Sequence, residues 1–491
     1  MNAERPFPSE LWEQSPAAVQ DYIRALEARV TALEAAVQRL EATVQHLTER
    51  LQQDSRTSSR PPSSDPPQAT TKRPRRDPSG RRPGGQPGHQ GQARALVPVA
   101  EVDVVIAVKP ERCRRCQYPL QGEDAQPERR QVMEIPPIKP VVTEYQLHQL
   151  GCPACGEATR GELPVGVSSG AFGPRVQAIT ALCTGAYHLS KRTTQRVLED
   201  LFGLPMSLGT IANLEQATVQ ALVEPVAEAR AYVQEQPAAY LDETGWREGR
   251  QRAWLWTAVT TWVTVFVVRL SRSRKVAQEL LGGRFWGYLV TDRWSASSWY
   301  PSWRRQVCWA HLLRDIEAMI ERGGGSQAIG EALRAQARQM FHWWHRVRDG
   351  TLSHASFARY MRPIRREVER LLEAGQTCGA PKTEGACREI LKLRQALWTF
   401  VRHAGVEPTN NAAERAIRPG VLWRKGSFGT QSAEGSCFVE AIMTVVATLK
   451  QQHRNVLDYL TAACEAALWG EPAPSLLPTP GELTQRFHPA A

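Results

Sequence analysis

The sequence predicts a multidomain protein in which helical segments accompany a mixed α/β core. Three observations support this fold class: a heptad repeat near the N-terminus, two Cys-x-x-Cys pairs, and a central run of strand-like segments interrupted by one helix. The chain has 491 residues and 42% hydrophobic content, which is enough for several domains with buried cores.

The charge and composition of the chain restrict its partners and location. Its net charge is +11 and its pI is near 9.3, which favours an acidic polymer, with nucleic acid the commonest and an anionic membrane surface the alternative. The polar first 20 residues do not resemble a secretion signal, and the apolar stretch 253–268 is shorter than a bilayer span of about 20 residues. We therefore expect a cytoplasmic protein with no membrane partner, whose ten cysteines serve metal binding or burial rather than disulfides.

Residues 1–55 contain a heptad repeat that predicts a leucine-zipper coiled coil. The a positions hold Ile23, Val30, Val37, Val44 and Leu51, and the d positions hold Leu26, Leu33, Leu40 and Leu47. β-Branched residues at a with Leu at d favour a parallel pair of helices, and Arg29 at g can pair with Glu34 at e of a second chain. We expect a homodimer, with a single amphipathic helix packed on its own protein as the alternative.

Residues 56–98 form a Pro- and Gly-rich segment that is almost empty of apolar side chains, so it cannot fold alone. Its central basic residues are Lys72, Arg73, Arg75, Arg76, Arg81 and Arg82. They can neutralise phosphates without reading bases, or they can belong to a solvated linker.

Two Cys-x-x-Cys pairs in residues 99–165 predict a zinc-binding module. Cys113 and Cys116 form the first pair, and Cys152 and Cys155 form the second. Four thiolates suit one tetrahedral, structural Zn²⁺, although four unrelated buried thiols are the alternative. The wide separation of the pairs indicates a zinc-ribbon-like module with a β-rich insertion over residues 131–150.

Residues 170–232 are expected to be helical and to bind DNA. One helix should reach Phe202, and after a break at Gly203 and Pro205 a second should begin near Ser207. This outline fits a helix-turn-helix, whose second helix enters a major groove, and it also fits any pair of packed helices. Lys191, Arg192 and Arg196 favour the DNA-binding interpretation.

The central region reads as three strands, a helix and two further strands. The predicted strands are 238–242, 253–260, 264–271, 287–292 and 305–310, and the helix is 274–283. This order predicts a ribonuclease H-like sheet in which the first strand ends at Asp242 and the fourth at Asp292. Carboxylates at two adjacent strand ends can hold two divalent cations about 4 Å apart, and their hard oxygens select Mg²⁺ or Mn²⁺.

A third carboxylate is predicted in the segment 407–420, which reads as a short helix that stops at Pro419. Asn410, Glu414 and Arg418 share one helix face at a spacing of four. Glu414 would complete the metal site, Asn410 would hydrogen-bond a water or a phosphate, and Arg418 would bind a phosphate oxygen. The catalytic domain would therefore comprise 236–315 and 405–465, with 316–404 a helical insertion and 466–491 a C-terminal tail.

Other residues near these carboxylates carry weaker signals. Glu243 is expected to face solvent or DNA, and Cys308 and Trp309 are expected to be core residues. His311 lies beside the predicted site as a possible accessory group, although a packed histidine is at least as good an interpretation. Arg424 and Lys425 would follow the Glu414 helix and contact DNA ends, or form a solvated basic turn.

Several motifs, in this order, resemble the transposases of the insertion sequence 66 family: "GRRPGGQPGHQG", the two Cys pairs, "YLDETGW", "LVTDRWSASSWY", "CWAHLLRDIE" and "NNAAERAIRPGVLWRKGSFGT". The resemblance covers nearly the whole chain. It implies a bacterial, nucleoid-associated DDE recombinase with Asp242, Asp292 and Glu414 as its triad. It also implies a zipper, a zinc module and accessory proteins encoded by the same element.

The resemblance implies metal-dependent hydrolysis at both element ends, followed by attack of the freed 3′-hydroxyls on target DNA, with the protein supplying position and charge stabilisation. Two alternatives have different activities. A DNA-binding regulator or domesticated transposase would bind without cutting, and a nuclease on the same fold would hydrolyse DNA without joining it.

Overall fold

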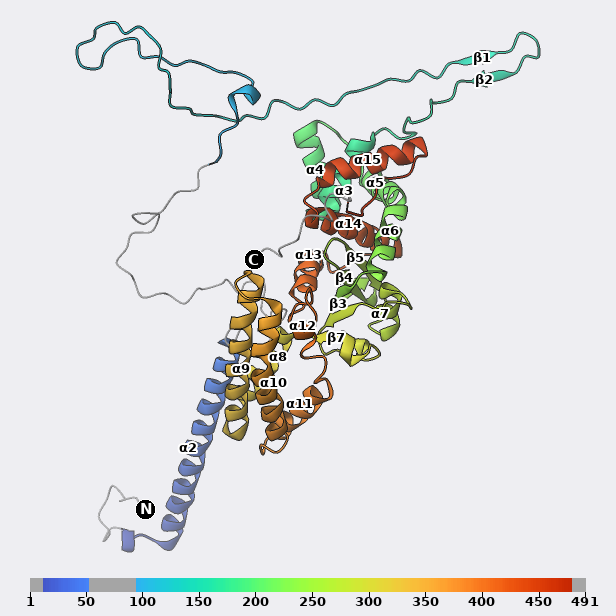
Figure 1. Cartoon of the computed structure of the whole chain (residues 1–491). Coiled ribbons are helices and arrows are strands. Elements are labelled where there is room, and N and C mark those ends of the chain that lie inside the picture. The colour runs from blue at the N-terminus through green and yellow to red at the C-terminus, as the bar shows by residue number, and fades with distance from the viewer. Residues whose placement is uncertain (1–11, 53–93, 479–491) are drawn as a thin grey trace. The chain divides into compact units, whose positions relative to one another are not determined.

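The computed structural model describes residues 12–52 and 94–478 (Figure 1). The six basic residues predicted to neutralise phosphates, from Lys72 to Arg82, lie outside these ranges. The chain divides into two units, which are described separately. One comprises Met1–Pro67, Tyr145–Arg196 and Met206–Ala491, and the other comprises Gln68–Glu144 and Val197–Pro205.

The heptad region forms one continuous helix, α2 (Ala17–Gln52). The a and d side chains of its central part are exposed: Leu26, Val30, Val37 and Val44, with Leu33 and Leu40 the most exposed at 64% and 65%. A helix of this length with an exposed apolar seam has a surface on which a second helix can pack.

The predicted β-rich insertion is wrong for most of its length. Residues 131–148 form no strand, and only the end of the segment pairs, as β1 (Gln149–Gly151) with β2 (Ala158–Arg160), antiparallel. Pro136, Pro137 and Pro140 account for this, because proline has no N–H to donate to a strand ladder. In the smaller unit, Gln131 fixes an extended segment by exchanging two side-chain hydrogen bonds of 2.8 Å with the backbone of Val97.

The helices predicted on either side of Gly203 are confirmed. They are α4 (Lys191–Phe202) and α5 (Leu208–Ala221), and the Ser207 hydroxyl caps α5 by accepting the Thr210 N–H at 3.0 Å. The neighbouring elements are α3 (Pro174–Ala181), a π-helical turn η3 (Leu182–Ala186), α6 (Val223–Gln234), α14 (Ala433–Gln451) and α15 (Val456–Trp469). Helices α3, α5, α14 and α15 pack on one another.

The central sheet has five strands in the order β5-β4-β3-β6-β7. They are β3 (Ala238–Glu248), β4 (Gln251–Val259), β5 (Thr264–Arg269), β6 (Tyr288–Thr291) and β7 (Arg305–Val307), with α7 (Arg274–Leu281) between β5 and β6. β3, β4 and β5 are antiparallel neighbours, whereas β6 is parallel to β3 and β7 is parallel to β6. The predicted succession of three strands, a helix and two strands is confirmed.

The predicted end of the first strand is wrong. β3 continues past Asp242 to Glu248, because its second half pairs with β4 in a hairpin whose tight turn includes Gly249 at φ +56°. Asp242 therefore lies within a strand, whereas Asp292 directly follows β6 as predicted.

The helix that carries Glu414 is longer than predicted. α13 (Asn411–Ser427) runs through Pro419 and packs on β3 and β4. Close packing explains the continuation: a Cβ on Gly420 would lie 2.4 Å from Leu255 Cδ2, so the second half of the helix sits directly against β4. This contact outweighs the one helical hydrogen bond that a proline removes.

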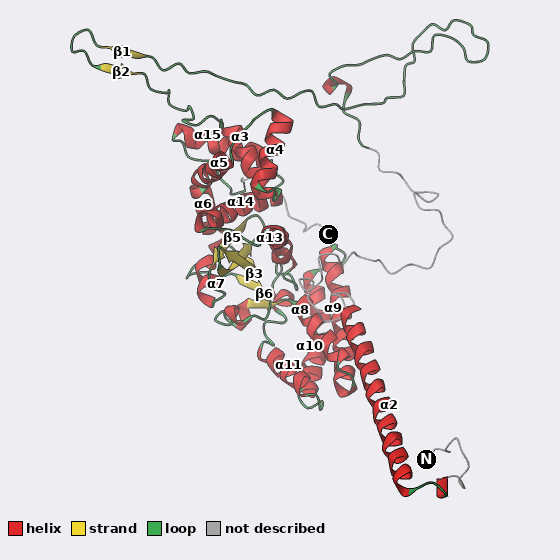
Figure 2. Ribbon diagram, turned by 180° about the vertical axis from the view of Figure 1, so that it is seen from behind, coloured by secondary structure: helices red, strands yellow, loops and turns green. Residues whose placement is uncertain are grey.

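The remaining helices form a bundle beside the sheet. They are α8 (Trp309–Glu321), α9 (Gly324–Arg348), α10 (His354–Gly375), α11 (Pro381–Lys392) and the short α12 (Thr399–Arg402). In both views the sheet lies between α8–α11 on one side and α3, α5, α6, α14 and α15 on the other (Figures 1 and 2). None of the described helices is long and apolar enough to cross a bilayer.

Where β3 begins beside β6, the two faces of the sheet belong to two hydrophobic cores. Leu241 and Leu289 pack in the core that includes α14, whereas Tyr240 and Val290 pack in the core that includes the bundle helices. Side chains two residues apart in a strand point to the same face. The strand positions that follow Tyr240 and Val290 by two therefore face the bundle side.

Candidate active site

The strand register places Asp242 and Asp292 level with each other. Tyr240 pairs with Val290 in the parallel β3–β6 ladder, and two residues further along each chain are positions 242 and 292. Burial, followed by the carboxylates of Glu243, Asp292 and Glu414, raises the pKa of Asp242 well above its usual range. The structure thus brings the three predicted carboxylates, from β3, the end of β6 and α13, into one electrostatic cluster.

Asp292 is held in place through its own backbone and a buried arginine. Its Oδ1 accepts the Trp294 N–H at 2.8 Å, and its carbonyl accepts from Arg305 Nη2 at 2.7 Å. Arg305 is 2% exposed and also donates to the Thr291 hydroxyl at 3.0 Å, and burial lowers its pKa to about 10. Sequence analysis missed Arg305; it follows Arg304 and begins a short strand that also contains Gln306, so no local pattern marks it as buried.

Asn410 joins the elements that carry the carboxylates. It is fully buried, its Nδ2 donates to the Leu241 carbonyl at 2.9 Å, and its backbone N–H donates to Cys308 Sγ at 3.1 Å. The first contact is made next to Asp242, and Asn410 itself immediately precedes the helix of Glu414. Complete burial separates Asn410 from a DNA phosphate, and its Nδ2 contact positions the carboxylates. Its Oδ1 has no hydrogen-bond partner among the described residues, so the predicted bond to a water stays a prediction.

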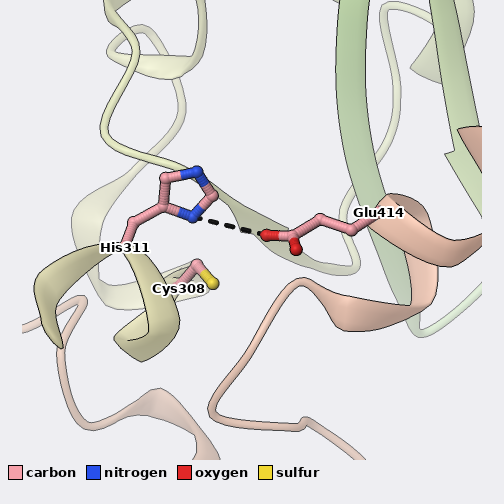
Figure 3. Close-up of side chains that lie close together, drawn as sticks. All are labelled: Cys308, His311 and Glu414. Carbon is pink, nitrogen blue, oxygen red and sulfur yellow. Dashed lines mark ion pairs between the residues drawn. The ribbon is translucent and has the colours of Figure 1, made fainter. Parts of the chain in front are cut away.

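Glu414 faces His311 across the site, from α13 and α8 respectively (Figure 3). His311 Nδ1 lies 3.5 Å from Glu414 Oε1, and neither atom has a hydrogen-bond partner among the described residues. Burial and the charge of Arg314 lower the pKa of His311, which keeps the ring neutral at pH 7. A buried carboxylate oxygen without a donor is an available ligand for a cation.

Cys308 lies close enough to join this pair, since ligand atoms of Cys308, His311 and Glu414 lie within 4.8 Å of one another. Its burial is complete, as predicted for a core residue, and Trp309 is likewise buried. Burial raises the pKa of the Cys308 thiol to about 11, and its sulfur already accepts the Asn410 N–H. A protonated thiol is a poor metal ligand, so the carboxylate oxygens and the neutral His311 ring are the better candidate ligands of the site.

The prediction that Glu243 faces solvent or DNA is wrong. Its side chain is 7% exposed and forms an ion pair of 2.6 Å with Arg272 Nη2. The Arg272 guanidinium carbon also lies 3.9 Å from the centre of the Trp294 ring. Arg272 and Trp294 were not singled out from the sequence, because only the folded sheet brings the loop after β5 to the loop after β6.

The predicted DNA-binding residues fall into two groups. Arg418 and Lys425 are exposed on α13, and Arg192 and Arg196 are exposed on α4. Arg424 instead donates to the Thr244 hydroxyl at 3.1 Å and to the Gly245 carbonyl, and Lys191 forms an ion pair of 2.5 Å with the nearly buried Glu215. Arg424 and Lys425 also lie in the last turn of α13 rather than after it.

The second helix of the predicted helix-turn-helix lacks basic residues. α5 has no Lys or Arg in its sequence, and it packs on α3, α14 and α15. A recognition helix normally exposes polar or basic side chains to the major groove. The exposed basic residues of this region lie on α4, which makes α4 the better candidate for a DNA contact.

The two Cys-x-x-Cys pairs have the same local structure. In the first, the Cys113 N–H donates to the Tyr118 carbonyl at 2.9 Å; in the second, the Cys152 N–H donates to the Glu157 carbonyl at 2.7 Å. Backbone N–H groups within each turn lower the pKa of the first thiol, Cys113 or Cys152. Each pair therefore favours the thiolate form that zinc requires.

Three family models match regions of this chain. A family model described as "Transposase IS66 family" matches residues 169–437, which is more than half of the chain. A model described as the zinc-finger binding domain of transposase IS66 matches residues 110–156, and one for a family of unknown function matches residues 10–95. "Uncharacterized protein y4qI" of Sinorhizobium fredii is 29% identical over 218 residues, which are 40% of this chain and 39% of that protein. The chain thus spans about two fifths of the length of this curated relative.

Proposed function

Because this chain belongs to the transposase IS66 family, we propose that it cuts DNA at the ends of an insertion sequence and joins them to target DNA. Asp242, Asp292 and Glu414 are the proposed catalytic carboxylates. The observation that carries this proposal is their convergence from β3, β6 and α13, expressed in the raised pKa of Asp242. Perturbed carboxylates that gather at one site are typical of catalytic centres.

The strand order supports a ribonuclease H-like catalytic domain. Three antiparallel strands have β6 and β7 added in parallel beside β3, so the strand that contains Asp242 is the neighbour of the strand that ends directly before Asp292. We assign 236–315 and 405–465 to this domain and 316–404 to a helical insertion. The bundle would then separate Asp292 from Glu414 along the chain but not in space.

The carboxylate cluster fits divalent cations. Asp242 is surrounded by three other carboxylates, and Glu414 Oε1 has no hydrogen-bond donor among the described residues, so the site carries excess negative charge. Asp242, Asp292 and Glu414 would hold two Mg²⁺ or Mn²⁺ ions. When bound, such ions lower the pKa of an attacking water and neutralise charge on the phosphate.

The other residues of the site would orient these ligands. Asn410 fixes the start of α13 to β3, and Arg305 fixes the carbonyl of Asp292. The neutral His311 ring lies beside Glu414 Oε1 and can take up a proton released near that oxygen. The DNA itself would be held by exposed basic residues, with Arg418 and Lys425 near the site and Arg192 and Arg196 on α4.

The N-terminal part would organise the complex. The exposed seam of α2 would pair two chains in a homodimer, which suits a reaction at two DNA ends. The two Cys pairs would hold one structural Zn²⁺ and brace a DNA-binding module. Accessory proteins of the same element remain further proposed partners.

The test is a cleavage and joining assay on labelled element-end DNA with Mg²⁺ or Mn²⁺. We expect the wild type to cut and join, whereas Asp242→Asn, Asp292→Asn and Glu414→Gln bind DNA but do neither. Glu331→Gln, an exposed change on α9, is the control and should retain activity. Binding without cutting by the wild type would favour a DNA-binding regulator, and cutting without joining would favour a nuclease.

A further inference from the structure

We propose that Trp294 stacks on a nucleotide base that has left the DNA helix beside the cleaved phosphate, and that the Glu243–Arg272 ion pair holds the indole for this contact. The inference rests on the proposed function, because it takes the carboxylates as the position of the reacting phosphate. It adds a residue that binds substrate and a distortion of the DNA at the cut.

The position of Trp294 is fixed relative to Asp292. Its backbone N–H donates to Asp292 Oδ1 at 2.8 Å, and its backbone carbonyl accepts from the Ser297 hydroxyl at 2.9 Å. Ser297 is itself buried and receives a further hydrogen bond from Thr291 at 3.2 Å. The backbone on both sides of the tryptophan is therefore anchored to the end of β6.

The indole is supported on one side by a chain of contacts from the neighbouring strand. Arg272 lies 3.9 Å from the ring centre and binds Glu243 through two nitrogens, at 2.8 Å from Nε and 2.6 Å from Nη2. Glu243 directly follows Asp242 in β3. The same contacts therefore connect the strands of both aspartates, and a nearly buried carboxylate holds the arginine.

Trp294 is nevertheless 41% exposed. Arg272 covers part of the indole ring, and another part of the ring is exposed to solvent. Base stacking on an aromatic side chain is favourable for any base, and a nearby arginine strengthens binding to nucleic acid. Successive nucleotides are about 3.4 Å apart, so the base next to a phosphate at Asp292 is within reach of a side chain two residues away.

A base in an intact duplex has neighbours on both faces and cannot stack on an indole. Enzymes that do chemistry on a base move it out of the stack at a cost of a few kcal/mol. A base beside a cleaved phosphate would carry the same cost, which stacking on Trp294 would offset. Trp294 is the exposed aromatic group placed to make such a contact at the carboxylate end of β6. A second possible role, a docking site for another protein, predicts no dependence on the DNA base.

The test is a double-mutant cycle between the tryptophan and the base. Full-length wild type and Trp294→Ala are titrated with element-end DNA in Ca²⁺, which permits binding without relying on cleavage. One series of DNAs carries an abasic nucleotide at each position around the cut in turn. We expect one such position to weaken wild-type binding about tenfold, within the range known for base–aromatic stacking. Trp294→Ala should lose about the same tenfold in affinity for intact DNA. Its affinity should fall no further when the abasic nucleotide is at that position. The affinity of Trp294→Phe for intact DNA should lie between those of the wild type and Trp294→Ala.

Trp286 provides a matched control. It is also exposed, and Arg304 lies 4.1 Å from its ring centre, but it precedes β6 and so lies at the opposite end of the strand from Asp292. Trp286→Ala should bind the abasic DNA more weakly than intact DNA by the same factor as the wild type does. Additive losses for Trp294→Ala and the abasic site, or no sensitive position, would overturn the inference.

Parallel cleavage reactions separate the two proposals. A wild type that shows the coupling in Ca²⁺ but never cuts in Mg²⁺ or Mn²⁺ would refute the catalytic function and retain the base contact. A wild type that cuts and joins without the coupling would retain the function and refute the base contact. Absence of DNA binding would refute both.

Discussion

At the scale of single residues, Asp242 contributes to the pH dependence of the stability of the metal-free protein. Its pKa is raised by burial and by neighbouring carboxylates, so the folded protein binds this proton more tightly than the unfolded chain does. The contribution of this group to the free energy of unfolding is greatest below the ordinary carboxyl pKa. It falls as the pH rises from that value through the raised pKa. At pH values above the raised pKa, this contribution is fully lost and no longer changes with pH.

Asp242→Asn should therefore stabilise the metal-free protein. The asparagine cannot ionise, so we expect a higher melting temperature than wild type in EDTA at neutral pH, and no difference from this source at acidic pH below the carboxyl pKa. Addition of Mg²⁺ or Mn²⁺ should raise the melting temperature of the wild type more than that of the variant. Thermal unfolding across pH, with and without metal, measures both effects; a variant that is less stable in EDTA at neutral pH would contradict this account.

The cysteine pairs make a second prediction at this scale. Cys113→Ser or Cys152→Ser should reduce bound zinc from about one ion per chain to little or none, because a structural site needs all four thiolates. Elemental analysis of the purified chain measures the content. Cys437→Ser, an exposed cysteine outside the pairs, should leave zinc unchanged. Retention of zinc by both pair variants would indicate that the pairs do not share one ion.

At the scale of elements, the close contact of α13 with β4 sets the position of Glu414. Gly420→Ala would place a Cβ 2.4 Å from Leu255 Cδ2 and 3.2 Å from Met443 Cε, and overpacking of this kind costs about 1–3 kcal/mol. We expect a lower free energy of unfolding and weaker catalysis. Gly426→Ala lies in the same helix with nothing within 4 Å, so it should be neutral or stabilising by about 0.5–1 kcal/mol. Chemical denaturation of the two variants checks the comparison, and equal effects would argue against tight packing at Gly420.

The same helix illustrates what local sequence signals can and cannot predict. The strand succession and the face shared by Asn410 and Glu414 follow from periodicity, which is a local property. The passage of α13 through Pro419 depends on contact with a strand more than 150 residues away, and the extension of β3 beyond Asp242 depends on its hairpin partner. Tertiary packing decided both, so no local pattern predicted them.

In the candidate site, too, local sequence signals predicted some residues, and others depended on tertiary contacts. The three carboxylates were predicted from strand ends and helix spacing, because acidic residues in those places are chemically informative, although Asp242 lies within β3 rather than at its end. Arg305 and Arg272 were missed, because their roles depend on burial and on partners in other elements. For Asn410, the predicted bond to a phosphate does not fit its complete burial, because the sequence does not reveal that the side chain points into the protein. The predicted bond to a water stays a prediction.

At the scale of the whole molecule, the exposed seam of α2 should control assembly. Replacing both Leu33 and Leu40 by Lys puts charge at two consecutive d positions and should convert a dimer to a monomer. Light scattering coupled to gel filtration measures the mass. Ala35→Lys, at a position outside the seam, should leave the dimer intact. We also expect the double variant to lose coordinated cutting at two ends while it retains DNA affinity at one end; an unchanged mass would refute the zipper.

The bundle between Asp292 and Glu414 also has a consequence during protein synthesis. The two acidic residues are 122 positions apart in the chain, and ribosomes add about 5–20 residues per second. A nascent chain therefore carries both aspartates for several seconds before its glutamate is made, and any product truncated in the bundle lacks the third carboxylate permanently. If the proposed function holds, prematurely terminated copies would lack one catalytic carboxylate and could not cut DNA, so activity would require translation past the bundle.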